Sequence, residues 1–210
     1  MCGGQLNEGL SLVQQAKENG ERLMPCRETG IVLLVEFNLL CQKYEKSHLP
    51  LLKENLLKVI SESIDHFEDE QEYVRDDFRL IIRLRASFIY LGIGLFCDIL
   101  SIPVSDDERK HGESCLNEVE KNWNQLQIRW KMIWYFAKAR VKQMDGFYEF
   151  AATLLAKALD IAGENNFTRE LQNIVKFREH CNEKLIEHSN KQDNIRQNIV
   201  ESCLNEFFDE

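Results

Sequence analysis

Apolar residues recur at helical spacing along almost the whole chain, and this periodicity limits the fold more than any other feature of the sequence. Only three prolines and ten glycines interrupt the 210 residues, which is too little turn punctuation for an all-β fold. The sequence therefore predicts an all-α protein. We expect helices at residues 6–24, 28–46, 49–68, 70–101, 106–125, 127–144, 147–163, 168–188 and 192–208.

Proline, glycine and capping residues mark several of the expected helix ends. Pro50 suits the first turn of a helix, where its missing amide hydrogen has no helical partner to lose. Ser105 and Glu108 have the spacing of a capping box, and Gly146 and Gly163 are placed to end helices. The loops are short and no linker divides the chain, so we expect a single all-helical domain over residues 1–210.

Charge, cysteine use and hydropathy narrow the class of protein. A formal net charge of -9 argues against general affinity for nucleic acid, although a local basic patch stays open. The seven cysteines form no CxxC pair and mostly have apolar neighbours, as reduced core cysteines do. We find no secretory signal, and the longest apolar run, residues 88–100, is too short to span a bilayer. We expect a cytoplasmic or nuclear protein without a membrane segment.

One stretch of the chain has the spacing of a helix-turn-helix repeat of about 34 residues. The matching residues are Tyr135, Ala139, Gly146, Ala151, Leu155 and Ala158. Alanines let two antiparallel helices approach closely, Gly146 makes the turn, and Tyr135 fills the space between helices. The stretch resembles the tetratricopeptide repeat, and the resemblance implies antiparallel helical hairpins that stack as a superhelix.

A second, earlier segment matches the opening of the same motif less closely. Its residues are Phe88, Leu91, Gly92 and Leu95, and the paired helix would be 106–125 with Cys115 and Val119 facing inward. The chain departs from the family pattern here, because Phe88 and Tyr135 are 47 residues apart. The resemblance covers residues 85–165; residues 1–84 would be divergent hairpins and residues 166–210 capping helices. An irregular helical bundle is the alternative.

The expected helix at 128–144 is apolar on two opposed faces, which is typical of a helix buried between neighbours. One face holds Ile128, Met132, Tyr135, Phe136 and Ala139, and the other holds Trp130, Ile133, Trp134, Ala137 and Val141. Basic side chains lie in the seams between these faces. Residues 121–144 contain six basic residues and no acidic one.

The candidate partner-binding residues lie on two of the expected helices. They are Arg79, Arg83 and Tyr90 on one face of the long apolar helix, and Lys131, Lys138 and Lys142 in a stripe on the next. The stripe can attract an acidic peptide or a phosphate, or it can pair with acidic helices of this chain. The resemblance implies a groove for extended peptides. The carboxylate-binding set of some family members is not reproduced, since Ile89, Ile93 and Phe96 stand at those positions.

We therefore expect a non-enzymatic scaffold or adaptor that binds an apolar or acidic helix or peptide in a groove lined by residues 79–96 and 128–142. Binding of RNA or another polyanion by the same basic residues is the alternative, and a small helical enzyme is a second alternative. We identify no catalytic residues and expect no cofactor. His180, Cys181 and His188 come nearest to a metal cluster, but their spacing on one helix does not suit ligands, so we expect no metal site.

The last expected helix has one broad apolar stripe near the end of the chain. Its members are Ile195, Ile199, Val200, Cys203, Leu204, Phe207 and Phe208. Such a stripe either caps the stack of helices or docks on another surface. The second case predicts a homo-oligomer or a larger complex formed through this helix.

Overall fold

The computed structural model describes residues 3–20 and 24–208, with side chains described for residues 4–20 and 24–191. The all-α prediction is confirmed. The helices are α1 (Gly3–Gly20), α2 (Arg27–Ser47), α3 (Pro50–Glu62), α4 (Glu72–Leu91), α5 (Asp106–Glu120), α6 (Ile128–Met144), α7 (Tyr148–Glu164) and α8 (Thr168–Phe208). Two short 3-10 turns, η1 (Asp65–Phe67) and η2 (Trp123–Gln125), precede α4 and α6. The described residues contain one isolated β-bridge, between Ile93 and Ile99, and no strand.

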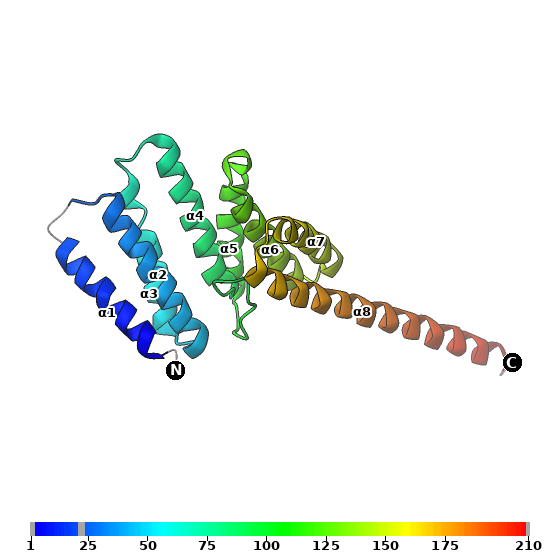
Figure 1. Ribbon diagram of the computed structural model, residues 1–210. Helices are drawn as coiled ribbons and strands as arrows, with labels where there is room; N and C mark the ends of the chain where they lie inside the picture. The colour runs from blue at the N-terminus through cyan, green and yellow to red at the C-terminus, as the bar shows by residue number, and fades with distance from the viewer. Residues whose placement is uncertain (1–2, 21–23, 209–210) are drawn as a thin grey trace.

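Helices that follow one another in the sequence lie side by side (Figure 1). Each helix from α1 to α7 packs against the helix that follows it in the sequence. In addition, α4 contacts α6, so the α4–α5 pair and the α6–α7 pair pack against each other. Helix α8 runs out beyond the other helices toward the C-terminus (Figure 1). The structure is therefore an all-helical chain in which neighbours in the sequence pack side by side.

Two hydrophobic cores lie on opposite sides of α4. Ile82 and Ile89 of α4 belong to the first core, which α2 and α3 complete with residues such as Phe37. Leu84 and Leu91 belong to the second core, which is formed with α5 to α8. Because α4 is apolar on two sides, it joins the N-terminal and C-terminal halves. The boundary expected between residues 84 and 85 falls inside this helix.

Small residues lie at the contact between α6 and α7. Ala139 of α6 and Ala151 and Ala158 of α7 have no solvent exposure, so the two helices approach closely. Gly146, in the connection between them, has φ 81°, a left-handed conformation that glycine adopts without strain. Leu155 is also completely buried in this core.

The expected start of α5 is present in detail. Ser105 Oγ accepts a hydrogen bond from the Glu108 amide at 3.2 Å, and Glu108 Oε2 accepts one from the Ser105 amide at 2.9 Å. Glu108 also pairs with Lys53 of α3 at 2.5 Å. Partial burial tends to raise the pKa of Glu108, but the bonds from Lys53 and Ser105 outweigh it and hold that pKa below its ordinary value.

The helix expected at 70–101 ends ten residues early, at Leu91. Gly92 takes φ 64° and ends the helix, so Gly92 and Gly94 do not lie inside it as the helical pattern suggested. A compact loop follows, in which the Leu100 amide donates to the Gly92 carbonyl at 2.9 Å. Leu95 therefore belongs to this loop, outside the helical position that the repeat motif would give it.

Several other boundaries differ from the sequence prediction. The helices expected at 49–68 and 106–125 end at Glu62 and Glu120, and each is followed by a 3-10 turn. Trp123 therefore lies on η2 rather than on the preceding helix. The two helices expected at 168–188 and 192–208 are one continuous helix, α8, because the polar residues between them contain neither proline nor glycine.

The apolar stripe expected on the last helix, residues 195–208, lies outside the side chains that the structure describes. Ile128 was expected on a buried face of α6 but is 46% exposed, because it is the first residue of the helix. No helix in the described part of the chain has both the length and the apolar character needed to cross a membrane.

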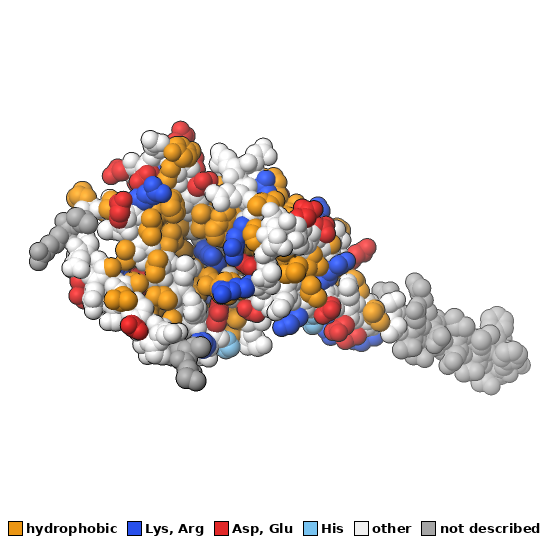
Figure 2. All heavy atoms as spheres, viewed as in Figure 1, with side chains coloured by type: hydrophobic (Ala, Val, Ile, Leu, Met, Phe, Trp, Pro, Cys, Tyr) orange, Lys and Arg blue, Asp and Glu red, His pale blue; other side chains and the backbone are white. Residues whose placement is uncertain are grey.

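Apolar and basic side chains are also unevenly distributed on the surface. On the face seen in Figure 2, a band of hydrophobic side chains follows the region of α2, α3 and α4, and Lys and Arg side chains gather nearer the middle. Leu51 of α3 and Tyr73 of α4 are among the exposed apolar residues, and Phe150 of α7 is another. Isolated exposed residues of this kind are common, whereas a contiguous set indicates an interface.

Candidate interaction surface

The two candidate arginines of α4 have acidic partners within the protein. Arg79 Nη2 lies 2.5 Å from Glu68 Oε1, just after η1. Arg83 Nε lies 3.0 Å from Glu118 Oε2 on α5. These pairs are about half exposed, so each contributes little to stability. They nevertheless direct both guanidinium groups toward this chain's own carboxylates.

Tyr90 lies in the angle between α4 and α5. Its ring stacks on that of His111, with the ring centroids 5.4 Å apart. Partial burial raises the pKa of its phenol. Tyr90 and Arg83 both line a pocket of about 200 Å³ between α3, α4 and α5. Arg83 and Tyr90 thus face α5 and α3, whereas Arg79 faces Glu68 in the segment between α3 and α4.

Helices α4 and α6 pack directly against each other where the sequence analysis expected a groove. Leu80 and Leu84 of α4 meet Leu126 and Trp130 there, and the cavity among them measures about 10 Å³. That volume is about the space of one water molecule. A peptide therefore has no room among Leu80, Leu84 and Trp130 at this end of the contact.

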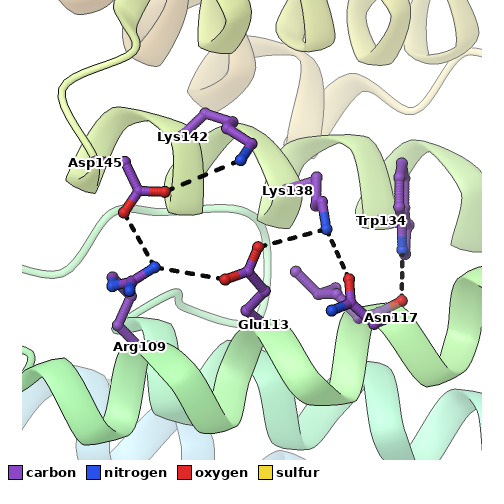
Figure 3. A network of polar contacts seen from close by, with 8 residues as sticks. Arg109, Glu113, Asn117, Trp134, Lys138, Lys142 and Asp145 are labelled. Atoms are coloured by element: carbon purple, nitrogen blue, oxygen red, sulfur yellow. Dashed lines mark hydrogen bonds and ion pairs between the residues drawn. The ribbon is translucent and has the colours of Figure 1, made fainter.

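Two lysines of the α6 stripe belong to a chain of ion pairs between α5 and α6 (Figure 3). Lys138 Nζ lies 3.7 Å from Glu113 Oε1, and Lys142 Nζ lies 4.0 Å from Asp145 Oδ2. Arg109 of α5 joins the two acids, at 3.5 Å from Glu113 and 3.0 Å from Asp145. Lys138 and Lys142 thus pair with acidic side chains of this chain.

The buried end of the same seam is held by Trp134. Its indole Nε1–H donates a hydrogen bond to the Leu116 carbonyl of α5 at 3.0 Å (Figure 3). Trp134 is 6% exposed, so this bond satisfies a donor and an acceptor that are both away from water. Beside it, Lys138 Nζ donates to Asn117 Oδ1 at 2.8 Å. These bonds set the register of α6 on α5.

The third lysine of the stripe, Lys131, has different surroundings. Its Nζ lies 5.4 Å from the ring centroid of Trp123, which is within the range of a cation–π contact. Lys157 of α7 lies at 5.5 Å from the ring of Tyr135 in the same way. Among the described residues, neither lysine has a carboxylate within 4.0 Å. These two charges therefore remain available to a partner.

An aromatic cluster lies between the two unpaired lysines. The rings of Trp123, Trp134 and Tyr135 meet edge to face, with centroids 5.1 to 5.4 Å apart. Together with Glu120, Leu154 and Lys157, they line an open pocket of about 460 Å³. The pocket combines an aromatic floor with one cation, Lys157, and one carboxylate, Glu120.

The apolar surface continues along α7 beyond this pocket. Phe147 is 54% exposed and Phe150 is 66% exposed, and their rings meet edge to face with the centroids 6.4 Å apart. Phe150, Leu154 and Lys157 follow at the spacing of one helix face. We call the whole set the aromatic-lysine face, which consists of Trp123, Lys131, Trp134, Tyr135, Phe147, Phe150, Leu154 and Lys157.

Most of the aromatic-lysine face was not among the candidate residues from the sequence, of which it contains Lys131 alone. Phe147, Phe150 and Lys157 lie in the segment that the sequence analysis used only as a repeat signal. One sequence signal could have identified this surface. The residues at 147, 150 and 154 are apolar, but they lie on a different side of the helix from the buried alanines. Because a helix that packs on one side needs only one apolar stripe, a second apolar stripe indicates a further contact surface.

The buried cysteines offer no reactive thiolate. Burial raises the pKa of Cys41 to about 12 and that of Cys181 to about 11, and it raises the pKa of Cys97 further. These thiols stay protonated near neutral pH, so they are poor nucleophiles and poor metal ligands there. In the part of the chain that the structure describes, no group of three or more His, Cys, Asp or Glu side chains is arranged to hold a metal ion.

The fold and this surface define an all-helical protein with an exposed aromatic and basic face. Comparisons of the chain with protein-family models, with curated proteins and with solved structures find no match.

Proposed function

We propose that this protein is a non-enzymatic scaffold or adaptor that binds an acidic amphipathic helix or peptide of a protein partner on the aromatic-lysine face. Its helical hairpins would stack in the manner of tetratricopeptide repeats. The observation that carries the proposal is an aromatic pocket with two lysines at its aromatic rings. Lys157 lines the pocket and Lys131 lies over the ring of Trp123, and neither has an acidic partner within 4.0 Å among the described residues.

The chemistry of this face suits a partner that is apolar on one side and acidic at its edges. Tyr and Trp side chains provide most of the binding energy in many protein interfaces, because they bury a large apolar area in few rotamers. Phe150 and Leu154 extend that area along α7 for a second turn of a bound helix. Lys131 and Lys157 on this face would orient the partner and increase its rate of association.

A peptide fits this face better than nucleic acid does. Affinity for a polyanion grows with the number of phosphates that lysines and arginines neutralise. Within the α6 stripe, Lys138 and Lys142 are already paired with Glu113 and Asp145, and the whole chain carries a net charge of -9. RNA binding through stacking on Trp123 and Tyr135 is the alternative that the test must distinguish.

Site-specific crosslinking tests the location of the binding surface. A photoreactive amino acid at Phe150 should crosslink a partner from cell extract, and the same group at Leu51, an equally exposed apolar residue of α3, should not. The captured partner is then identified and its contact segment mapped. Equal capture at the two positions, or capture that nuclease treatment abolishes, would contradict a peptide site on this face.

Charge reversal with a matched control tests the role of the lysines. The double variant Lys131→Glu with Lys157→Glu should weaken binding of the mapped segment by at least tenfold, whereas Lys58→Glu with Lys110→Glu changes the net charge equally and should leave binding unchanged. With two lysine contacts, affinity should fall roughly tenfold between 50 and 200 mM salt. A loss of a thousandfold or more would favour the polyanion alternative.

A further inference from the structure

A second pocket lies on another part of the molecule, where the loop after α4 meets α6 and α8. Its volume is about 320 Å³, near the lower end of the range of small-molecule sites, which is roughly 300 to 1,000 Å³. The polar side chains that line it are Asp98 of the loop, Arg140 and Gln143 of α6, and Asn173, Lys176 and His180 of α8. None of these residues belongs to the aromatic-lysine face.

Arg140 is a partly buried cation whose hydrogen bonds go to neutral acceptors. Its Nε donates to the Leu91 carbonyl at 3.3 Å, and its Nη1 donates to Gln143 Oε1 at 2.6 Å. Among the described residues, no carboxylate lies within 4.0 Å of its guanidinium group. Desolvation lowers the pKa of Arg140, but a guanidinium group stays charged at any physiological pH. An anion in the pocket would supply the missing opposite charge.

Hydrogen-bond donors from two helices converge on the same space. Gln143 accepts from Arg140 with its oxygen, so its amide group can donate into the pocket. Lys176 and His180 are one turn apart on α8 and share a face. The Asn173 amide donates to the Phe96 carbonyl at 2.9 Å, which fixes the loop against α8 and shapes the wall of the pocket.

Asp98 is the one acidic side chain that lines the pocket, and it opposes an anion there. Burial raises the pKa of its carboxyl group, and the charge of Lys176 offsets only part of that rise. One carboxylate thus stands against two permanent cations, Arg140 and Lys176, and the imidazole of His180. The remaining positive charge and the number of donors suit a group with more than the two acceptor oxygens of a carboxylate.

We propose that this pocket binds the phosphate group of a phosphate monoester, with Arg140 and Lys176 as its charged contacts and Gln143 and His180 as further donors. A phosphate monoester carries close to two negative charges and three acceptor oxygens, which match these donors. The pocket is larger than a phosphate group, so it also contacts the group to which the phosphate is attached. Two sources share this chemistry, a phosphorylated side chain and a phosphorylated small molecule.

Calorimetric titration of the full chain tests the proposal. The probes are a phosphoserine peptide and glucose 6-phosphate, each compared with its unphosphorylated form. We expect saturable binding of at least one phosphorylated probe and none of its counterpart. Tighter binding of the peptide assigns the pocket to protein-borne phosphate, and tighter binding of the sugar phosphate assigns it to a small molecule. Absence of saturable binding of both probes up to 10 mM would overturn the proposal.

Variants assign the binding to this pocket. Lys176→Ala should weaken binding roughly tenfold or more, since it removes a charge-assisted hydrogen bond. Asp98→Asn should strengthen binding, an effect that a merely structural role does not predict. Arg178→Ala, at an exposed position of α8 outside the pocket, should change nothing. Arg140→Gln should abolish binding, with circular dichroism to verify folding. Unchanged affinity in both Lys176→Ala and Asp98→Asn would place the binding elsewhere and refute the assignment.

Discussion

Gly112 of α5 lies directly against Leu91 of α4, and replacing this glycine by alanine tests the packing of the two helices. A methyl group at Gly112 would lie 2.7 Å from Leu91 Cγ and 2.8 Å from Leu91 Cδ2. Leu91 has no solvent exposure, and its carbonyl accepts the hydrogen bond from Arg140. The side chain therefore has little room to move away from a new methyl group.

Two opposed effects set the magnitude. Alanine is favoured over glycine inside a helix by ~1 kcal/mol, whereas overpacking a core costs about 1–3 kcal/mol. Because Leu91 is confined, we expect a cost in the upper part of that range and a net destabilisation of about 1–2 kcal/mol. For a chain of this size, that corresponds to a decrease in Tm of about 2–8 °C.

Gly163 of α7 is the matched control, because no atom lies within 4 Å of the methyl group that an alanine would place there. Gly163→Ala should stabilise the protein by up to ~1 kcal/mol, through helix propensity alone. Thermal melts followed by circular dichroism, with urea titrations to obtain the free energy of unfolding, measure both variants. If Gly112→Ala raised the Tm as Gly163→Ala does, the α4–α5 contact described above would be wrong.

Three further predictions concern polar and reactive groups. Trp134→Phe should lower the free energy of unfolding by about 0.5–1.5 kcal/mol in urea titrations, because the buried hydrogen bond from its indole to the Leu116 carbonyl is lost; an equal loss in Trp123→Phe would argue against this cause. Since folding holds the pKa of Glu108 below its ordinary 4.5, its charge stabilises the fold above that pH and the contribution is lost as the pH falls below it. The variant Glu108→Gln should thus be less stable than the wild type at pH 7, and the difference should shrink as the pH falls below 4.5; a difference that does not shrink would contradict this assignment. Finally, Cys41 and Cys181 should react with iodoacetamide at pH 8 only after unfolding, as intact mass spectrometry can show; rapid labelling of the folded protein would contradict their burial.

Local features of the fold could be predicted because their causes lie within a few residues. The capping box at Ser105 and Glu108 and the turn at Gly146 depend on short-range backbone chemistry, and the structure contains both. The early end of α4 could not be read in this way. The residues after Leu91 continue the apolar pattern because they fill the space around a folded loop, and periodicity alone does not distinguish that from a helix.

The candidate site was predicted less well than the fold, because the sequence shows which charges are present but not which ones are already paired. Lys131, Lys138 and Lys142 are equivalent on a helical wheel. Only the structure brings Glu113 opposite Lys138 while leaving Lys131 over the ring of Trp123.

The sequence by itself determined that this chain is helical and where α6 and α7 turn back on each other, since helix propensity, capping and close alanine packing act between near neighbours. The tertiary structure decided which surfaces stay open. It packed α4 against the start of α6, left the aromatic-lysine face exposed, and gathered Asp98, Arg140 and Lys176 around one pocket. These outcomes depend on contacts between residues far apart in the chain, whose geometry no local pattern contains.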